Sequence, residues 1–281
     1  MLKKLFKHEM RSTAKTFMWL YIAFLVISLV CALFMRLGPN DAGGAPGAFP
    51  TALVAILMML YVLATAAIAI GTVVVIILRF YRNLLGDEGY LMMTLPVSRN
   101  ELILSKLFVS VIWSVCSAAL VFLSVLIIVA GTGTFAGLSQ SIGEIITAGA
   151  PLGQWIVFFV IALIVSCFSG VLTLFAAMSI GPNLLKNRLG GSILAFIIII
   201  VASQIINFAT VFVTRSIIGG FTMPRGIATA AMANGNLGFS LPFVNQIVNA
   251  VTLSSLIGSV IVAVACWFLT RYMLTKKLNL A

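Results

Sequence analysis

Residues able to do acid–base, nucleophilic or metal chemistry are few in this sequence and lie far apart. Its 281 residues include one histidine, four cysteines and six acidic residues. The sequence contains no P-loop, no HExxH or GxSxG motif, and no pair of aspartates within an apolar stretch. Such a chain is too poor in titratable groups to build a general acid–base site, so we do not expect it to be an enzyme by itself.

Two further patterns that resemble chemical motifs have ordinary explanations. The cysteines lie in four different apolar stretches and form no CxxC pair, which favours small apolar side chains over a metal site or a disulfide framework. The segment Gly131–Ala136 reads GTGTFA and matches the dinucleotide fingerprint G-x-G-x-x-A. It follows an apolar stretch rather than a strand, so we expect no nucleotide there and no cofactor elsewhere in the chain.

Six long apolar stretches make up most of the chain and must form the framework that positions any functional residues. The chain is 62% hydrophobic and 8% charged, whereas soluble proteins are roughly half apolar and about a quarter charged. Each stretch has the ~20 residues that a helix needs to cross a bilayer core. We therefore predict an all-α integral membrane protein with six transmembrane helices. The predicted spans are Phe17–Met35, Thr51–Leu78, Leu107–Ala130, Leu152–Ile180, Ser192–Val213 and Ile247–Thr270.

The basic residues predict how the chain is oriented. A net charge of +11 would suggest a nucleic-acid partner in a soluble protein, but here all except three of the 17 basic residues fall on one side of the predicted spans. The exceptions are Arg36, Arg215 and Arg225. By the positive-inside rule both termini lie in the cytoplasm, which agrees with an even number of spans. We expect a multi-pass protein of the cell membrane that binds no nucleic acid.

Residues 1–16 combine basic and apolar side chains at helical spacing. The apolar side of this helix would be formed by Leu2, Leu5, Phe6 and Met10. The lysines and Arg11 face elsewhere, which predicts an interfacial amphipathic helix whose cations meet anionic head groups. A disordered basic tail is the alternative.

Residues 214–246 form a long segment on the predicted outer side. Turn signals such as Gly219–Gly220 and Pro242 alternate with apolar patches, and charge is scarce. We expect short re-entrant helices here, between the fifth and sixth spans, and an ordinary extracellular loop is the alternative.

The predicted spans hold mild polarity rather than charge. The fifth span contains Ser203, Gln204, Asn207 and Thr210, and Gln204 and Asn207 are three residues apart on one face. These four residues are candidates for a substrate path, with packing between helices as the alternative. No charged residue lies near the middle of a span, which disfavours a carrier driven by an ion gradient.

The predicted cytoplasmic loop 79–106 holds the most distinctive residues. Ser98 and Glu101 have the spacing of a capping box and predict a helix that begins near Arg99 and continues into the third span. Before it, two acidic residues suited to a helix N-terminus precede large apolar groups, a pattern typical of a docking surface. These docking candidates are Gly86, Asp87, Glu88, Gly89, Tyr90, Leu91, Met92 and Met93. A connector that skims the membrane is the alternative.

The string FYRNLLGDEGYLMMTLPVSRNELILSK, Phe80–Lys106, resembles the first cytoplasmic loop of permease subunits of the ABC-2 type, which have the type V fold of ATP-driven exporters. GDEG and LPVSR are its most specific parts, and the layout is similar over nearly the whole chain. The resemblance implies one permease domain, residues 1–281, in which Gly86–Met93 is a coupling helix. It also implies a separate cytoplasmic ATPase subunit that holds ATP and Mg, and a second permease copy, identical or related.

Within that family the chain is similar to bacterial exporters of amphipathic peptides, toxins or antimicrobials, including the phenol-soluble-modulin type. We therefore expect a permease subunit in a bacterial plasma membrane that exports amphipathic or hydrophobic cargo. Two alternatives stay open: a non-transporting scaffold or sensor subunit that binds a cytoplasmic partner through the same loop, and an ion-coupled secondary carrier.

Overall fold

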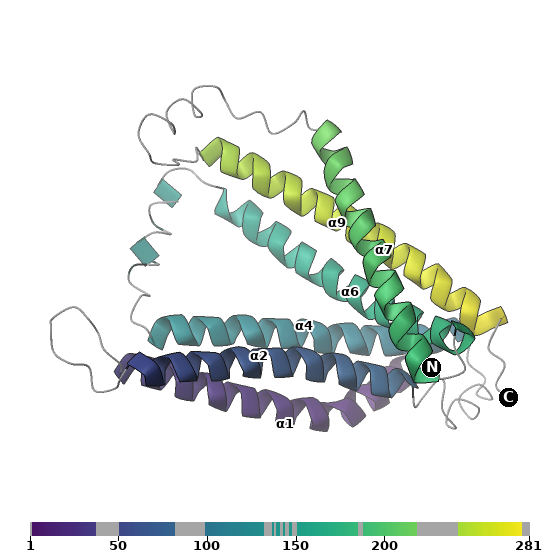
Figure 1. Ribbon diagram of the computed structural model, residues 1–281, viewed down its shortest axis with the longest axis horizontal. Coiled ribbons are helices and arrows are strands. Elements are labelled where there is room, and N and C mark those ends of the chain that lie inside the picture. Colours follow the sequence, from purple (N-terminus) through teal and green to yellow (C-terminus); the bar gives the residue numbers. More distant parts are fainter. Residues whose placement is uncertain are drawn as a thin grey trace. The chain divides into compact units, whose positions relative to one another are not determined.

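The computed structural model consists of six long helices (Figure 1). They are α1 (Leu2–Leu37), α2 (Thr51–Phe80), α4 (Arg99–Gly131), α6 (Leu152–Leu184), α7 (Arg188–Ile217) and α9 (Leu241–Lys276). The structure describes residues 2–37, 51–81, 99–131, 151–184, 188–217 and 241–276, together with 137, 139–140, 143 and 146–147. Regular structure within these ranges is entirely helical, which confirms the predicted all-α class.

All six helices are long and apolar enough to cross a membrane, so the six predicted spans are confirmed in number and approximate place. The apolar stretches are Glu9–Arg36, Ala55–Phe80, Ile103–Gly131, Leu152–Gly181, Gly190–Thr214 and Val248–Met273. Large apolar side chains cover their outer surfaces: Trp19, Ile56 and Phe208 are 73%, 67% and 66% exposed. An apolar exterior of this extent suits lipid rather than water and indicates a multi-pass membrane protein.

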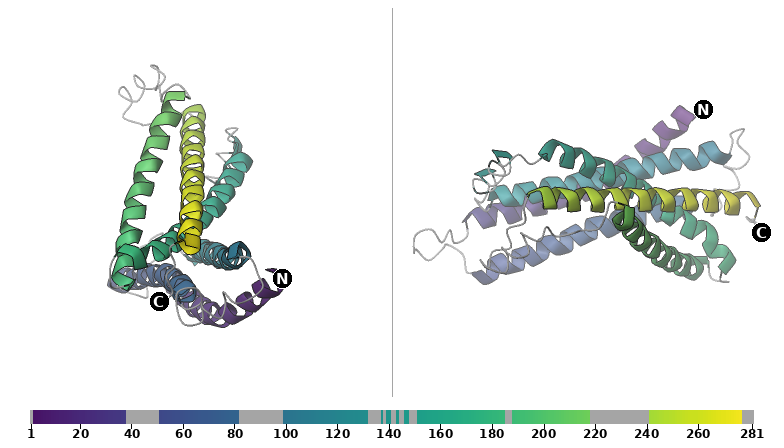
Figure 2. Two further views of the ribbon diagram at one scale, coloured as in Figure 1. Left: turned by 90° about the vertical axis from the view of Figure 1, so that its right-hand side faces the viewer. Right: turned by 90° about the horizontal axis from the view of Figure 1, so that it is seen from above.

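The helices divide between two compact units of the chain. The N-terminal unit, Met1–Ile142, contains α1, α2 and α4, each in contact with the other two. The C-terminal unit, Gly143–Ala281, contains α6, α7 and α9, which also pack pairwise. α9 runs without a break along its whole length (Figure 2). The single predicted domain, 1–281, thus consists of two three-helix units in the part of the chain that the structure describes.

Small residues and aromatic rings explain the close packing of the N-terminal unit. A Cβ atom added to Gly131 would lie 2.5 Å from the carbonyl oxygen of Ala32, and one added to Gly71 would lie 2.8 Å from the Leu20 side chain. Glycine is therefore required for α4 to approach the α1 backbone this closely, whereas at Gly71 the end of the Leu20 side chain could move aside. Elsewhere in the same unit the Phe17 ring stacks on Trp113, with centroids 4.5 Å apart.

In the C-terminal unit, α6 and α7 are in backbone contact where they face each other near Gly181 and Gly191. A Cβ atom added to Gly181 would meet the Ser192 side chain and lie 2.5 Å from the Ser192 backbone nitrogen. One added to Gly191 would meet the Gly181 carbonyl. By contrast, a Cβ atom at Gly170, further along α6, would meet nothing within 4 Å. Gly170 with Ser166, and Gly71 with Ala67, have the four-residue spacing of small residues that favours close helix contacts. Of these two glycines, only Gly71 has a neighbouring side chain within 4 Å of an added Cβ atom.

The helix ends refine the predicted boundaries. α4 begins at Arg99 and continues into the third apolar stretch, as expected, and Glu101 lies in its first turn. Ser98, the proposed cap, lies outside the described residues. Residues 2–16 are helical but form the first part of α1 rather than a separate element, and their place at a membrane interface stays a prediction.

The predicted outer segment 214–246 is shortened from both sides by helices. α7 continues to Ile217 and α9 already begins at Leu241, several residues before the predicted sixth span. Pro242 belongs to the first turn of α9, where a missing N–H group breaks no helical hydrogen bond. The expected re-entrant helices would occupy 218–240, outside the described residues, and remain a prediction.

Candidate functional site

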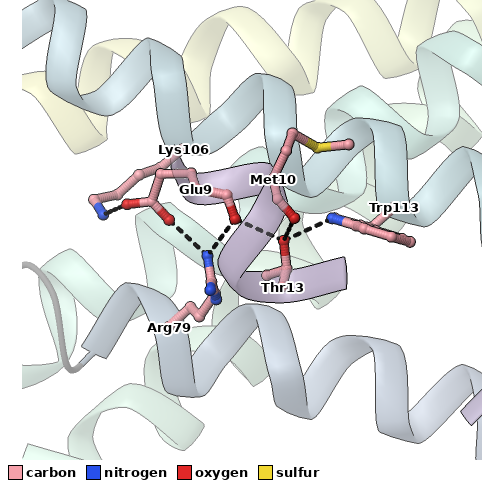
Figure 3. A network of polar contacts seen from close by, with 6 residues as sticks. All are labelled: Glu9, Met10, Thr13, Arg79, Lys106 and Trp113. Atoms are coloured by element: carbon pink, nitrogen blue, oxygen red, sulfur yellow. Dashed lines mark hydrogen bonds and ion pairs between the residues drawn. The ribbon is translucent and has the colours of Figure 1, made fainter. Parts of the chain in front are cut away.

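Three charged side chains from three helices meet inside the N-terminal unit (Figure 3). The Glu9 carboxylate accepts hydrogen bonds from Lys106 Nζ at 2.7 Å and from Arg79 Nη1 at 2.6 Å, one at each oxygen. Arg79 Nη1 also donates to the Glu9 carbonyl oxygen at 3.1 Å. Lys106 and Glu9 are buried, with side chains 7% and 9% exposed, and Arg79 is 26% exposed. We call these three residues the ion cluster.

The ion cluster joins α1 to both ends of the loop between α2 and α4. Arg79 is the penultimate residue of α2, and Lys106 lies in the second turn of α4. Between them runs the loop that contains the candidate docking residues. Glu9, on α1, is therefore bonded to both stems of that loop. A buried carboxylate held by two cations is strongly oriented, because any movement that separates the charges breaks ion pairs that are shielded from water.

The local sequence explains why Glu9 points inward. Glu9, Thr13 and Phe17 are spaced four residues apart and form one buried face of α1. Thr13 accepts a hydrogen bond from the Trp113 indole nitrogen of α4 at 2.9 Å (Figure 3). Its hydroxyl also bonds to the Glu9 carbonyl at 2.8 Å. The polar residues of this face thus all have partners, as buried polar groups require.

A line of hydroxyl groups continues from the ion cluster into the apolar part of the unit. Tyr21 of α1 and Thr72 of α2 both bond to Ser117 Oγ of α4, at 2.7 Å and 2.9 Å. Nearer the other end of the unit, Tyr61 of α2 bonds to Ser124 of α4 at 2.8 Å. Each pair joins two helices, so these hydroxyl pairs fix how the three helices lie against one another.

Replacing Tyr21 by phenylalanine should lower the stability of the protein modestly. The variant loses the bond to Ser117 and a 3.1 Å bond to the Trp113 carbonyl, while Thr72 still bonds to Ser117. Hydrogen bonds between membrane helices average about 0.6 kcal/mol each, so we expect a loss of about 1 kcal/mol. Thermal unfolding in detergent, as a double-mutant cycle with Ser117→Ala, measures the shared part; additive effects would contradict the coupling.

The apolar side predicted for residues 1–16 is only partly the buried side of α1. Phe6 and Met10 are half-buried, whereas the polar residues Glu9 and Thr13 are buried. The prediction considered how the apolar and basic residues of this helix would meet a membrane, and therefore missed that Glu9 is buried. A usable signal was present: Glu9 is the single acidic residue among the basic ones of this segment, and it precedes Thr13 and Phe17 at four-residue spacing.

The candidate docking residues, Gly86–Met93, lie outside the described residues. What the structure adds is the geometry of the two stems, which begin at Phe80 and Arg99. The proposed role of Gly86–Met93 stays a prediction.

The four polar residues predicted for a substrate path all lie on α7 but do not form one polar surface. Gln204 is exposed, and the Ser203 hydroxyl bonds to the carbonyl of Ile200 in its own helix. Asn207 and Thr210 instead face α9, where Gly258 leaves room for both side chains. Packing between helices is thus the visible role of Asn207 and Thr210, and a substrate path that includes these residues stays a prediction.

Among the described residues, no group of three or more histidine, cysteine, aspartate or glutamate side chains is placed to hold a metal ion. Comparison of the chain with protein-family models, with curated proteins and with solved structures gave no match. The functional reading of this protein therefore depends on its own residues and their geometry.

Proposed function

We propose that this protein is the permease subunit of an ATP-driven exporter of the ABC-2 type. The observation that supports this most directly is the bonding of Glu9 to Arg79 and Lys106, the two stems of loop 82–98. A force applied to this loop by a cytoplasmic partner would displace both stems and α1 together. A loop that couples a motor to a membrane domain needs such a connection, because a force absorbed by flexible stems would move nothing.

The remaining parts of the proposal follow from the resemblance of Phe80–Lys106. Two ATPase subunits would bind ATP and Mg, and two permease copies would pair in the plasma membrane of a bacterium with both termini cytoplasmic. The cargo would be amphipathic or hydrophobic, such as a peptide, toxin or antimicrobial.

The double variant Asp87→Ala with Glu88→Ala tests the coupling loop. We expect ATP-driven transport to fall roughly tenfold or more, since charged groups buried at a protein interface contribute several-fold to hundreds-fold in affinity. The measurement is co-purification of an ATPase with the tagged chain from its own host, followed by ATP turnover in vesicles with and without a fluorescent amphipathic peptide. Asp41→Ala, which removes a carboxylate from the predicted outer side, is the matched control.

The same experiment separates the alternatives. An ATPase that co-purifies with the wild type but whose turnover never depends on this chain would indicate a scaffold or sensor subunit. Transport without any ATPase, driven by an ion gradient, would indicate a secondary carrier. Unchanged transport and ATP turnover in the double variant would contradict the proposed coupling loop.

A further inference from the structure

The side of α1 that faces away from the ion cluster carries two exposed cations and an exposed indole ring. They are Arg11, Lys15 and Trp19, which are spaced four residues apart. Glu9 and Thr13, by contrast, point toward the other helices of the unit (Figure 3). Within the part of the chain that the structure describes, neither Arg11 nor Lys15 forms a hydrogen bond or an ion pair. Both cations are therefore available to a ligand, and we call Arg11, Lys15 and Trp19 the exposed stripe.

The exposed stripe continues into an aliphatic surface of the same helix. Three large aliphatic residues further along α1 are also exposed, namely Ile22, Val26 and Leu29. α1 is helical from Leu2 to Leu37, and at 3.6 residues per turn all these exposed positions fall within about 80° around its axis. One face of α1 thus presents, in order, two cations, an indole ring and aliphatic side chains.

The contacts of the opposite face show which part of α4 lies level with the exposed stripe. Lys106 bonds to Glu9 and Trp113 bonds to Thr13, so the part of α4 between them lies beside the start of the stripe. At this level α4 exposes Phe108, a side chain that suits lipid rather than water. Cations at such a level extend along the helix so that their charged ends reach the phosphates at the membrane surface.

We propose that the exposed stripe binds a phospholipid of net negative charge. Arg11 and Lys15 bind its phosphate, Trp19 lies beside its glycerol region, and an acyl chain follows the aliphatic side chains of the same face. A zwitterionic lipid is disfavoured because its own cation competes for the phosphate. The site lies on the opposite side of α1 from Phe6 and Met10, which the sequence predicted as part of the apolar side of an interfacial helix. This inference needs only that α1 spans a membrane and does not depend on the proposed transport function.

Retention of phosphatidylglycerol by the full chain in phosphatidylcholine nanodiscs tests the proposal. Native mass spectrometry counts the retained phosphatidylglycerol, and thermal unfolding measures the stabilisation that it gives. A hydrogen bond to a charged group contributes roughly tenfold in affinity, so Arg11→Gln and Lys15→Gln should each weaken binding by about that factor. The double variant should retain no more phosphatidylglycerol than phosphatidylcholine. Arg36→Gln, at an exposed position in the last turn of α1, is the matched control and should change binding less than about twofold, because no second cation lies one turn before it.

Further measurements keep the outcomes distinct. Because neither cation bonds to the rest of the described chain, all variants should unfold like the wild type in phosphatidylcholine alone, and Lys15→Arg should still bind. Equal retention by the wild type and the double variant would overturn the site, as would an equally large loss in Arg36→Gln. If inorganic phosphate stabilises the detergent-solubilised wild type but not the double variant, the stripe takes free phosphate and the lipid assignment is wrong. If poly-glutamate binding depends on Arg11 and Lys15 while phosphatidylglycerol binding does not, the stripe is a surface for an acidic protein and the proposal is wrong.

Discussion

Replacing Glu9 by glutamine should destabilise the N-terminal unit more than any other single change of charge in the described residues. The variant leaves Lys106, which is 7% exposed, and Arg79 without the carboxylate that neutralises them. Removing one partner of a buried ion pair typically costs roughly 3–5 kcal/mol, because the remaining charge stays buried and loses that partner. We expect an effect near the lower end, since Arg79 is a quarter exposed and can turn toward solvent. Chemical or thermal unfolding of the purified protein in detergent measures it.

A second substitution distinguishes the effect of losing the Glu9 charge from the effect of disturbed packing around residue 9. Combining Glu9→Gln with Lys106→Met removes the buried cation together with its partner, and an apolar side chain of similar length should restore much of the stability. Lys15→Gln, an exposed position on α1, should have little effect. If Glu9→Gln alone unfolds like the wild type, the ion cluster contributes nothing to the stability of the N-terminal unit.

Replacing Gly181 by alanine should disrupt the contact between α6 and α7. The added methyl group would overlap the Ser192 side chain and lie 2.5 Å from its backbone nitrogen and 2.6 Å from its Cα atom. Backbone atoms cannot move aside as a flexible side chain can, so the two helices must separate. Inserting one methylene into a packed core typically costs about 1–3 kcal/mol, and we expect the upper part of that range.

Gly170→Ala is the matched control on the same helix. A Cβ atom there meets nothing within 4 Å, and alanine is the better helix former by roughly 1 kcal/mol. This variant should be neutral or slightly stabilising in thermal unfolding experiments. Equal loss of stability in the Gly170 and Gly181 variants would show that the α6–α7 contact is not what makes Gly181 sensitive.

The six helices could be predicted because a bilayer leaves a chain few choices. An apolar stretch of more than about 20 residues must satisfy its backbone internally, which a helix does by local hydrogen bonds. The start of α4 at Arg99 was predictable from local signals, because Pro96 disfavours a helix before it and Ser98 and Glu101 have the spacing of a capping box. The early start of α9 was missed because Pro242 was taken for a turn residue, although proline is equally suited to a first helical turn.

The ion cluster could not be predicted because its contacts join distant parts of the chain. Glu9 is 70 residues from Arg79 and 97 residues from Lys106, and no local pattern reports such a separation. The charge pattern was interpreted as a signal for orientation, which grouped Arg79 and Lys106 with the other cations. Similarly, no local pattern indicates that Gly258 of α9 lies against Asn207 of α7, 51 residues earlier. Which side of a helix meets a neighbour is decided by tertiary packing.

The hydroxyl pairs of the N-terminal unit limit how its helices can slide. A piston-like shift of α1 by a single residue would be about 1.5 Å along its axis, enough to break the 2.7 Å bond between Tyr21 and Ser117. The bond between Tyr61 and Ser124 limits the sliding of α2 along α4 in the same way, at a different height in the unit. These bonds hold each helix at one position along its axis relative to its neighbours. A conformational change that preserves these bonds would move α1, α2 and α4 together as one rigid body.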